Sequence, residues 1–198
     1  MKKNIAFFEF DGTITTKDTL LEIIKYARGA VSFWWGFGLL SPWLVAMKAG
    51  VISNSDAKQK VLRHFFGGWP EERFRQMCEG FARERIPGLI RPKALEQIRE
   101  HQRNGVRVVV VSASPENVVD PWCQAYQLEC IATRLEIRER VLSGWINGAN
   151  CYGEEKVRRI REQIDIDTYG DIYAYGDSGG DKPMLALATV AVYKPFRD

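Results

Sequence analysis

Acidic side chains that could share one reaction site follow two separate hydrophobic runs of the sequence. Glu9 and Asp11 end the first run two residues apart, so both can point the same way from an extended strand. Asp177 and Asp181 lie in a glycine-rich stretch after another run. Taken singly, these acids fit solvated turn residues or helix caps. If they lie close together, the carboxylates repel one another, and a bound hard cation would offset this repulsion. Oxygen ligands favour Mg²⁺ over zinc.

A hydroxyl and an ammonium group stand at comparable positions. Ser112 ends a valine-rich run, and Lys156 opens a helical stretch. If the ends of these runs are neighbours in the fold, four carboxylates, a hydroxyl and an ammonium group line one pocket. A divalent cation, a lysine and a helix N-terminus together favour a dianionic phosphate ligand. The expected reaction is therefore phosphoryl transfer, in which positioning and charge stabilisation supply most of the catalysis.

The runs that must position these groups alternate between strand and helix patterns. Valines fill most of 106–111, which is typical of a strand buried on both faces of a parallel sheet. Ser114 followed by Pro115 predicts a helix start with Ser114 as the N-cap. The pattern predicts an α/β fold with a Rossmann-like parallel sheet and ligands beyond the carboxyl ends of its strands. Strands are predicted at 5–10, 106–111, 172–175 and 190–193, helices at 94–102, 154–163 and 183–187, and a hairpin within 133–146.

The segment 16–86 differs from the rest of the chain. It shows no strand alternation, looks helical, and holds four of the six tryptophans. It carries 11 basic and 7 acidic residues, a net charge of +4, whereas the remainder of the chain carries −1. We therefore expect a helical insert at 16–86 on a Rossmann-like core formed by 1–15 and 87–198.

Composition narrows the class of protein. The 198 residues are 45% hydrophobic and 27% charged, which excludes a disordered or low-complexity chain. The net charge of +3, without a block of like charges, does not indicate a nucleic-acid partner. Four cysteines without a CxxC pair indicate reduced thiols rather than a disulfide scaffold or a zinc site. Acids near the N-terminus interrupt what would be a signal peptide, so we expect a cytoplasmic protein.

One run in the insert is unusually apolar. Residues 29–47 contain no charge and are flanked by Arg28 and Lys48. A spanning helix needs about 20 apolar residues, so the length is borderline; two glycines and the Ser41-Pro42 pair argue against one straight helix. We expect two short helices joined at Ser41-Pro42. Three interpretations stay open: they form the core of the insert, they face a membrane surface, or they span a bilayer.

Four motifs resemble those of the haloacid dehalogenase superfamily. Phe-Glu-Phe-Asp-Gly-Thr-Ile-Thr at 8–15 resembles its first motif, Asp-x-Asp-Gly-Thr, and Ser112-Ala113-Ser114 resembles the second. Lys156 fits the third motif, and Gly-Asp-Ser-Gly-Gly-Asp at 176–181 fits the fourth. The order and spacing resemble the phosphoserine-phosphatase-like branch, which implies that the insert is a helical cap. The resemblance spans nearly the whole chain.

This resemblance implies a Mg²⁺-dependent phosphatase that works through an acyl phosphate on the carboxylate at position 9. It implies that Asp11 protonates the leaving alcohol and then activates water. Lys156 neutralises charge and holds the nucleophile, and Asp181 orients Lys156 or waters on the metal. The implied phosphate-binding groups are Gly12, Thr13, Ser112, the amide of Ala113, and Lys156. The implied Mg²⁺ ligands are the carboxylates of Glu9 and Asp177 and the backbone carbonyl of Asp11.

The sequence departs from the superfamily pattern at the nucleophile position, where Glu9 replaces the usual aspartate. The extra methylene moves the attacking oxygen by about one C–C bond, and a misplacement of about 1 Å can cost on the order of 100-fold in rate. Three explanations stay open: an introduced Asp→Glu substitution, a naturally weak or inactive relative, or reaction of Glu9 through a shifted backbone. We favour the first because every other motif residue is in place.

The expected function is hydrolysis of phosphomonoesters with Mg²⁺, in a form impaired by Glu9. The expected substrate is a phosphorylated small molecule or an amphiphile such as a lipid phosphate, with peripheral membrane contact through 29–47 and no nucleic acid. The alternatives are a small-molecule phosphatase of the phosphoserine type and a non-catalytic phosphate- or lipid-binding relative. Asp18 and Arg63 could meet substrate across the cleft, although a solvated helix face fits them better.

Overall fold

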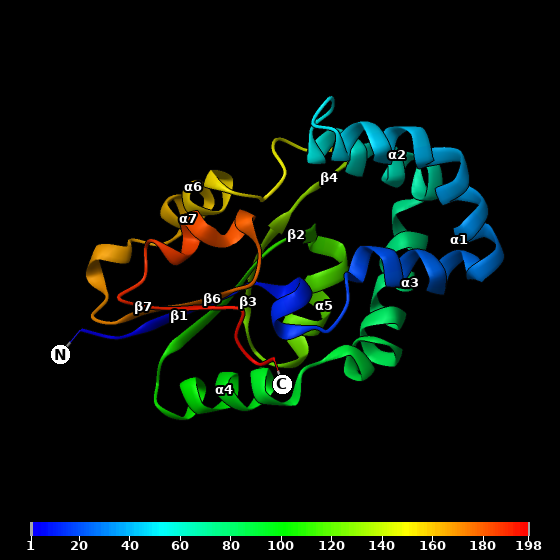
Figure 1. Cartoon of the computed structure of the whole chain (residues 1–198). Coiled ribbons are helices and arrows are strands. Elements are labelled where there is room, and N and C mark those ends of the chain that lie inside the picture. The colour runs from blue at the N-terminus through cyan, green and yellow to red at the C-terminus, as the bar shows by residue number, and fades with distance from the viewer. Residues whose placement is uncertain (1, 198) are drawn as a thin grey trace.

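A parallel five-stranded sheet forms the centre of the computed structural model, which describes residues 2–197 (Figure 1). Its strand order is β3-β2-β1-β6-β7, and all four neighbouring pairs are parallel. The predicted α/β, Rossmann-like fold is confirmed. The strands are β1 (Ile5–Phe8), β2 (Arg107–Pro115), β3 (Glu129–Thr133), β6 (Ile172–Gly176) and β7 (Val190–Tyr193).

Helices cover both faces of this sheet. Alternate residues of a strand point to opposite faces, and accordingly Phe8 of β1 belongs to one hydrophobic cluster and Phe7 to another. The first cluster includes side chains of α4 and α5, and the second includes side chains of α6 and α7. Burial on both faces explains the unbroken valine run of β2. The four helices are α4 (Pro92–Arg103), α5 (Glu116–Ala125), α6 (Glu154–Gln163) and α7 (Lys182–Leu185).

Three helices between β1 and α4 form a separate layer at one end of the sheet (Figure 1). The chain enters and leaves this layer through adjacent segments, because Thr15 and Ile90 pair as an antiparallel bridge. A hairpin of β4 (Leu135–Arg138) and β5 (Val141–Ile146) packs against α2 of the layer. The division into core and cap at 16–86 remains our proposal. The layer consists of α1 (Thr19–Lys48), α2 (Asn54–Phe66), α3 (Glu71–Glu84) and a short 3₁₀ turn, η2 (Ile86–Leu89).

The apolar run of the layer breaks at a different residue from the one predicted. We expected two helices joined at Ser41-Pro42, but α1 continues through Pro42 and departs from helical geometry at Gly29 (φ 76°, ψ 165°). Gly29 adopts a positive φ that costs other residues energy. The direction of α1 changes visibly between its first part and 30–48 (Figure 1).

A local hydrogen bond explains why α1 tolerates Pro42. Proline has no N–H to donate to the carbonyl four residues earlier, which belongs to Gly38. The hydroxyl of Ser41 donates to this carbonyl oxygen at 2.7 Å. The Ser41-Pro42 pair therefore satisfies the backbone that proline alone would leave unpaired.

Candidate active site

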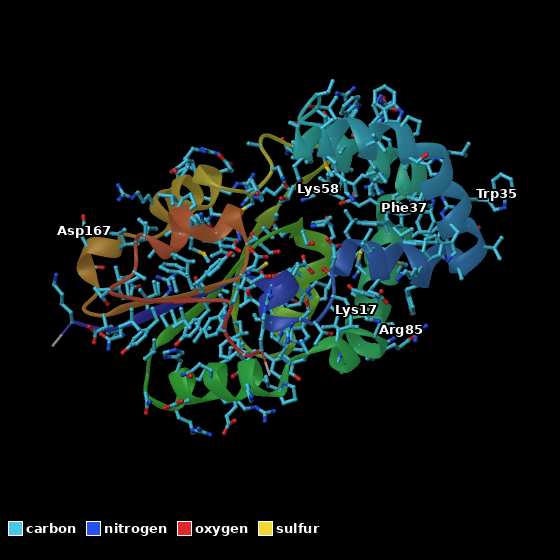
Figure 2. The ribbon with its side chains drawn as sticks, in the orientation of Figure 1. Lys17, Trp35, Phe37, Lys58, Arg85 and Asp167 are labelled. Atoms are coloured by element: carbon cyan, nitrogen blue, oxygen red, sulfur yellow. The ribbon has the colours of Figure 1, made fainter. Side chains whose placement is uncertain are left out.

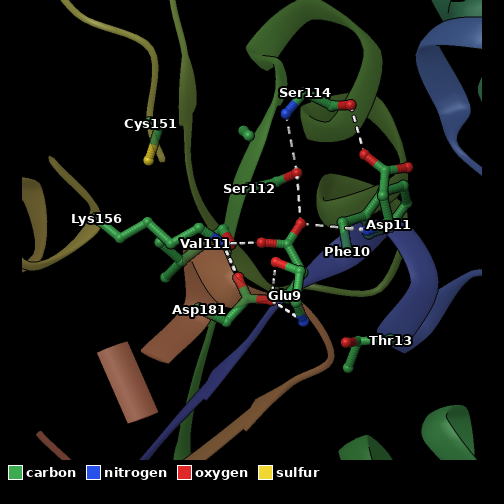
Figure 3. Close-up of polar contacts among 12 residues, drawn as sticks. Glu9, Phe10, Asp11, Thr13, Val111, Ser112, Ser114, Cys151, Lys156 and Asp181 are labelled. Atoms are coloured by element: carbon green, nitrogen blue, oxygen red, sulfur yellow. Dashed lines mark hydrogen bonds and ion pairs between the residues drawn. The ribbon is translucent and has the colours of Figure 1, made fainter. Parts of the chain in front are cut away.

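The predicted site residues lie at the carboxyl ends of three adjacent strands. Glu9 directly follows β1, Ser112 lies in β2, and Asp177 directly follows β6. Since β1 pairs with both β2 and β6, the three residues come from neighbouring positions at one edge of the sheet. Figure 3 shows Glu9 and Ser112 directed toward each other, with Lys156 approaching from α6.

The carboxylate of Glu9 is almost fully buried and is held by three groups. Its Oε2 forms an ion pair with the ammonium of Lys156. Its Oε1 accepts a hydrogen bond from the hydroxyl of Ser112 at 3.0 Å and from the backbone N–H of Asp11 at 3.3 Å. Glu9 therefore occupies the space between Ser112 and Lys156, the two side chains for which phosphate binding is predicted.

Lys156 is buried and anchored to the sheet. Its Nζ donates to the backbone oxygen of Val111 at 2.9 Å and pairs with Oδ1 of Asp181 at 2.8 Å. Burial lowers the pKa of Lys156, and the charge of Asp181 opposes this shift. Burial acts to raise the pKa of Asp181, but Lys156 and hydrogen bonds from Ser178 outweigh it and hold that pKa below its usual value. Asp181 thus fixes Lys156 against Glu9.

Asp11 points away from Glu9, contrary to the expectation that both side chains extend in one direction. β1 ends at Phe8, and a short helical turn begins at Phe10, so strand alternation does not reach these acids. Oδ1 of Asp11 accepts hydrogen bonds from the backbone N–H and the hydroxyl of Thr19, both at 2.7 Å. Oδ2 accepts one from Ser114 at 2.5 Å.

The environment of Asp11 suits proton transfer. Burial, together with the smaller effect of the charge of Asp18, raises the pKa of Asp11 to about 6, although hydrogen bonds from Ser114 and Thr19 oppose this shift. A carboxyl group whose pKa lies near neutrality can give up and regain a proton at moderate cost.

Ser114 does not cap a helix as predicted. β2 extends through Pro115, and α5 begins at Glu116 without a side-chain cap. Instead its hydroxyl reaches Asp11 across the site. Ser114 and Thr19 are therefore site residues that sequence reasoning missed; the Ser-x-Ser repeat at the end of the valine run was the available signal for Ser114.

Asp177 lies directly against the backbone of the first motif. A Cβ added to Gly12 would stand 2.5 Å from Oδ2 of Asp177, and Gly12 has a φ of +79°. Oδ1 of Asp177 accepts a hydrogen bond from the hydroxyl of Thr13 at 3.2 Å. Oδ2 pairs with Arg197 at 2.6 Å, a contact with the C-terminal segment that the sequence did not suggest.

The donor set at this edge of the sheet fits Mg²⁺. No group of three or more His, Cys, Asp or Glu side chains within residues 2–197 is arranged to hold a metal. Magnesium usually uses one or two carboxylates and keeps several waters. Glu9 and Asp177 would supply two carboxylates, and the space that glycine leaves open at position 12 lets Asp177 approach the backbone around Asp11. The side chain of Asp11 is engaged elsewhere, so only its carbonyl is available as a ligand.

The helical layer contributes a cation that the sequence did not single out. Lys58 of α2 donates to the backbone oxygen of Ala113 and to Oδ1 of Asn150, both at 2.9 Å. Burial lowers the pKa of Lys58, and the charges of Asp11 and Asp18 oppose this shift. Figure 2 shows Lys58 on the side of α2 that faces the sheet. Helical spacing alone could not identify it, because its partners are distant in the sequence.

The two other insert residues considered for substrate contact have local partners. Asp18 is exposed and accepts a hydrogen bond from the backbone N–H of Leu21 as the N-cap of α1. The guanidinium of Arg63 lies 4.5 Å from the ring centre of Trp145 on the hairpin. Neither contact brings the side chain to Glu9 or Asp177.

Comparison with known proteins places these residues in a family context. A family model described as haloacid dehalogenase-like hydrolase matches residues 6–186. The chain is similar to Protein CicA of Caulobacter vibrioides, with 35% identity over 98% of this chain and 86% of CicA. It is 29% identical to a probable phosphatase of Mycobacterium tuberculosis, over 98% of this chain and 70% of that protein. It is 26% identical to a histidinol-phosphatase of Neisseria meningitidis, over 96% of this chain and 89% of that protein.

Solved structures share the fold. A protein of unknown function from Bordetella pertussis superposes with a TM-score of 0.81 and 20% identity, covering 96% of this chain and 88% of that one. A phospho-aspartyl intermediate analogue of phosphoserine phosphatase superposes with a TM-score of 0.69 and 20% identity, covering 98% and 86%. At this identity the likeness concerns the fold.

Proposed function

We infer that this chain, which belongs to the haloacid dehalogenase-like hydrolase family, is a phosphatase of the phosphoserine-phosphatase-like branch. Beyond this, we propose that it hydrolyses phosphomonoesters with Mg²⁺ through a phosphorylated carboxylate at position 9. The observation that carries the proposal is the convergence of Glu9, Ser112 and Lys156, with Asp11 held separately by Ser114 and Thr19.

The proposed reaction proceeds in two displacements at phosphorus. In the first, a carboxylate oxygen at position 9 forms a bond to phosphorus while the bond from phosphorus to the substrate oxygen breaks. The protonated carboxyl of Asp11 gives its proton to the leaving alkoxide, and the alcohol departs. In the second, Asp11 takes a proton from water, the water oxygen bonds to phosphorus, and the acyl–phosphate bond breaks. Inorganic phosphate leaves, and the free carboxylate at position 9 and the protonated carboxyl of Asp11 are restored.

The surrounding groups bind the phosphoryl oxygens and hold the acid. The hydroxyl of Ser112, the ammonium of Lys156 and the backbone near Gly12 and Thr13 supply donors and positive charge. The carboxylates of Glu9 and Asp177 would hold Mg²⁺, which would supply further positive charge to the phosphoryl group. Asp181 keeps Lys156 in place, so little reorganisation is needed when charge develops on the phosphoryl group.

The geometry around Glu9 supports slow turnover by the present form. The glutamate carboxylate contacts both Ser112 and Lys156, so it competes with a phosphate for the same donors. An aspartate at this position is one methylene shorter, leaving more room for the phosphate between those two groups. The side chain of Glu9 therefore occupies part of the phosphate site, and this slows the reaction of the present form.

Comparison of the parent chain with Glu9→Asp tests this function directly. Release of inorganic phosphate from p-nitrophenyl phosphate is measured with Mg²⁺ and with EDTA. We expect the Asp form to turn over about 100-fold faster than the parent, and only with the metal. A third chain, Glu9→Asp with Asp11→Asn, controls for contaminating phosphatase and should be inactive. If the Asp form releases no phosphate from any phosphomonoester tested, the chain is a non-catalytic phosphate-binding relative and the proposal fails.

The substrate class that we favour is an amphiphilic phosphomonoester. The layer that supplies Lys58 to the site also carries several exposed apolar side chains within 30–48. A substrate with an apolar chain could contact both features. The test compares phosphatidic acid in mixed micelles with glycerol 3-phosphate, using the Glu9→Asp form. We expect a higher kcat/KM for the lipid, and the opposite ranking would exclude this preference.

The alternative substrate is a small phosphorylated metabolite. Two relatives carry names that refer to such compounds, phosphoserine phosphatase and histidinol-phosphatase. Lys58 offers a cation beside the site that could hold an anionic head group. Phosphoserine and histidinol phosphate belong in the same panel; a Lys58→Ala variant should raise KM for phosphoserine more than for p-nitrophenyl phosphate if Lys58 meets the carboxylate.

A further inference from the structure

An apolar surface on α1 is turned toward solvent. The side chains of Trp34 and Trp35 are 69% and 72% exposed, and Leu39 is 65% exposed. Figure 2 shows Trp35 directed away from the molecule, whereas Phe37 of the same helix points inward. We name this surface the tryptophan face. It comprises Val31, Trp34, Trp35, Leu39, Trp43 and Val45.

Exposure of this surface to water is unfavourable. Contiguous exposed apolar patches are rare on soluble proteins, and large ones mark interaction sites. Trp34, Trp35, Gly38 and Leu39 also line a shallow hollow of about 330 Å³. The tryptophan face therefore needs an apolar partner.

The inward side of the same helix is already occupied. Phe33 and Leu40 are buried, and the ring of Phe37 lies 5.7 Å from that of Phe65 in α2. By length and composition α1 could cross a membrane, but a crossing would pull 30–48 away from α2. The bend at Gly29 instead lets 30–48 lie flat while its inner side stays packed.

The charges around the tryptophan face favour an anionic surface. Residues 23–55 contain no Asp or Glu, and Lys48 is the last residue of α1. Lys60 of α2 lies 4.2 Å from the ring centre of Trp43, at the border of the face. A second copy of the chain would bring two such basic borders together, which like-charge repulsion opposes. Anionic lipid head groups complement both the basic border and the exposed tryptophans.

We propose that the tryptophan face docks the protein on an anionic bilayer surface, with 30–48 lying in the head-group region. Tryptophan side chains prefer this interface because one part of the ring is apolar and the indole N–H is polar. The docked helix belongs to the layer that also supplies Thr19 and Lys58 to the active site. Docking therefore holds the helical layer, and with it Thr19 and Lys58, on the bilayer.

Vesicle binding tests the proposal without Mg²⁺ or substrate, so its failure leaves the proposed reaction untouched. The parent chain is sedimented with vesicles of phosphatidylcholine alone and of phosphatidylcholine mixed with phosphatidylglycerol. We expect binding to the mixed vesicles that weakens with added salt. Trp34→Ser combined with Trp35→Ser should lower the partition coefficient by about 10-fold or more. Trp145→Ser removes a partly exposed tryptophan of the hairpin and is the matched control, with a change below about 2-fold.

Two further measurements decide the identity of the partner. Lys48→Glu with Lys60→Glu should reduce binding to anionic vesicles, while circular dichroism checks that each variant is folded. If the parent chain does not bind the vesicles, the proposal is overturned. It is also overturned if the double Trp variant and Trp145→Ser lose vesicle binding to the same extent. Light scattering that shows a dimer, dissociated by the double Trp variant without vesicle binding, would mean that a second copy covers this face.

Discussion

The hydroxyl of Ser114 lies 2.5 Å from Oδ2 of Asp11, and this contact joins the end of β2 to the turn that follows β1. The other oxygen of Asp11 is bound by Thr19, the first residue of α1. The proposed acid and base is therefore clamped between the sheet and the helical layer. Its position depends on how these two parts of the chain pack.

Loss of the Ser114 hydroxyl should misplace Asp11. In the Glu9→Asp background, we expect Ser114→Ala to lower kcat by about 10-fold with little change in KM, because the hydroxyl contacts the acid rather than the substrate. Ser114→Thr keeps the donor and should restore most of the rate. Steady-state kinetics on p-nitrophenyl phosphate measure both parameters. An equal loss in the Ala and Thr variants would show that packing, not the hydrogen bond, matters at this position.

Arg197 should compete with the metal for Asp177. Its guanidinium lies 2.6 Å from Oδ2 of Asp177, so Mg²⁺ binding there has to displace it. We expect Arg197→Ala to bind Mg²⁺ about 3-fold more tightly, as measured by isothermal titration calorimetry. Arg161→Ala removes an exposed arginine on α6 and is the control for the change in net charge. Weaker binding in Arg197→Ala would instead mean that Arg197 helps to hold Asp177 in place.

Gly12 should tolerate no side chain. A Cβ there would meet Asp177 at 2.5 Å, and its φ of +79° disfavours other residues. We expect Gly12→Ala to lose about 1–2 kcal/mol of unfolding free energy from the backbone alone, and to weaken Mg²⁺ binding by displacing Asp177. Urea unfolding and calorimetry measure the two effects. Gly88→Ala, at an open position without a positive φ, is the control. Unchanged metal binding in Gly12→Ala would place the metal away from Asp177.

His101 should make stability depend on pH. This side chain is buried, and its Nε2 lies 2.9 Å from the hydroxyl of Tyr175. Burial lowers the pKa of His101, and the charge of Glu100 only partly opposes this. Tyr173 is the other titratable side chain in ring contact. The folded state favours the neutral form of His101. Its contribution to the free energy of unfolding is therefore complete above pH 6.5 and is lost as the pH falls below that value.

Urea unfolding at several pH values checks this expectation. The parent chain should show a falling midpoint below about pH 6.5, and His101→Gln should flatten that dependence. His64→Gln replaces an exposed histidine and should leave the dependence unchanged. If His101→Gln retains the full pH dependence of the urea midpoint, other titratable groups cause that dependence.

The local pattern of the sequence was sufficient for the elements that carry the motifs. The strand at 190–193 and the helix at 154–163 occur with the predicted bounds. Hydrophobic periodicity reports such elements well because burial of a strand or helix face is a property of a short run of residues. The alternation of these elements also fixed the parallel α/β class. The hairpin was less well predicted: it begins at Leu135, because Thr133 belongs to β3 of the main sheet.

Competing local signals in the sequence led to wrong predictions at two sites. Pro42 indicated a break, but the hydroxyl of Ser41 satisfies the freed carbonyl, and the break occurs at Gly29. Ser114 resembled an N-cap, but its hydroxyl binds Asp11 instead. The hydroxyl of Ser114 could make either hydrogen bond, and only the folded backbone selects one.

By itself, the sequence determined the fold class, the motif order and the unusual glutamate at position 9, because each is a property of residue type and spacing along the chain. Tertiary structure decided which distant groups meet: Lys58 with Asn150, Ser114 with Asp11, and Arg197 with Asp177. It also decided which apolar residues of 30–48 face α2 and which face solvent. These outcomes depend on how helices pack on one another and on the sheet, and no short stretch of sequence contains that information.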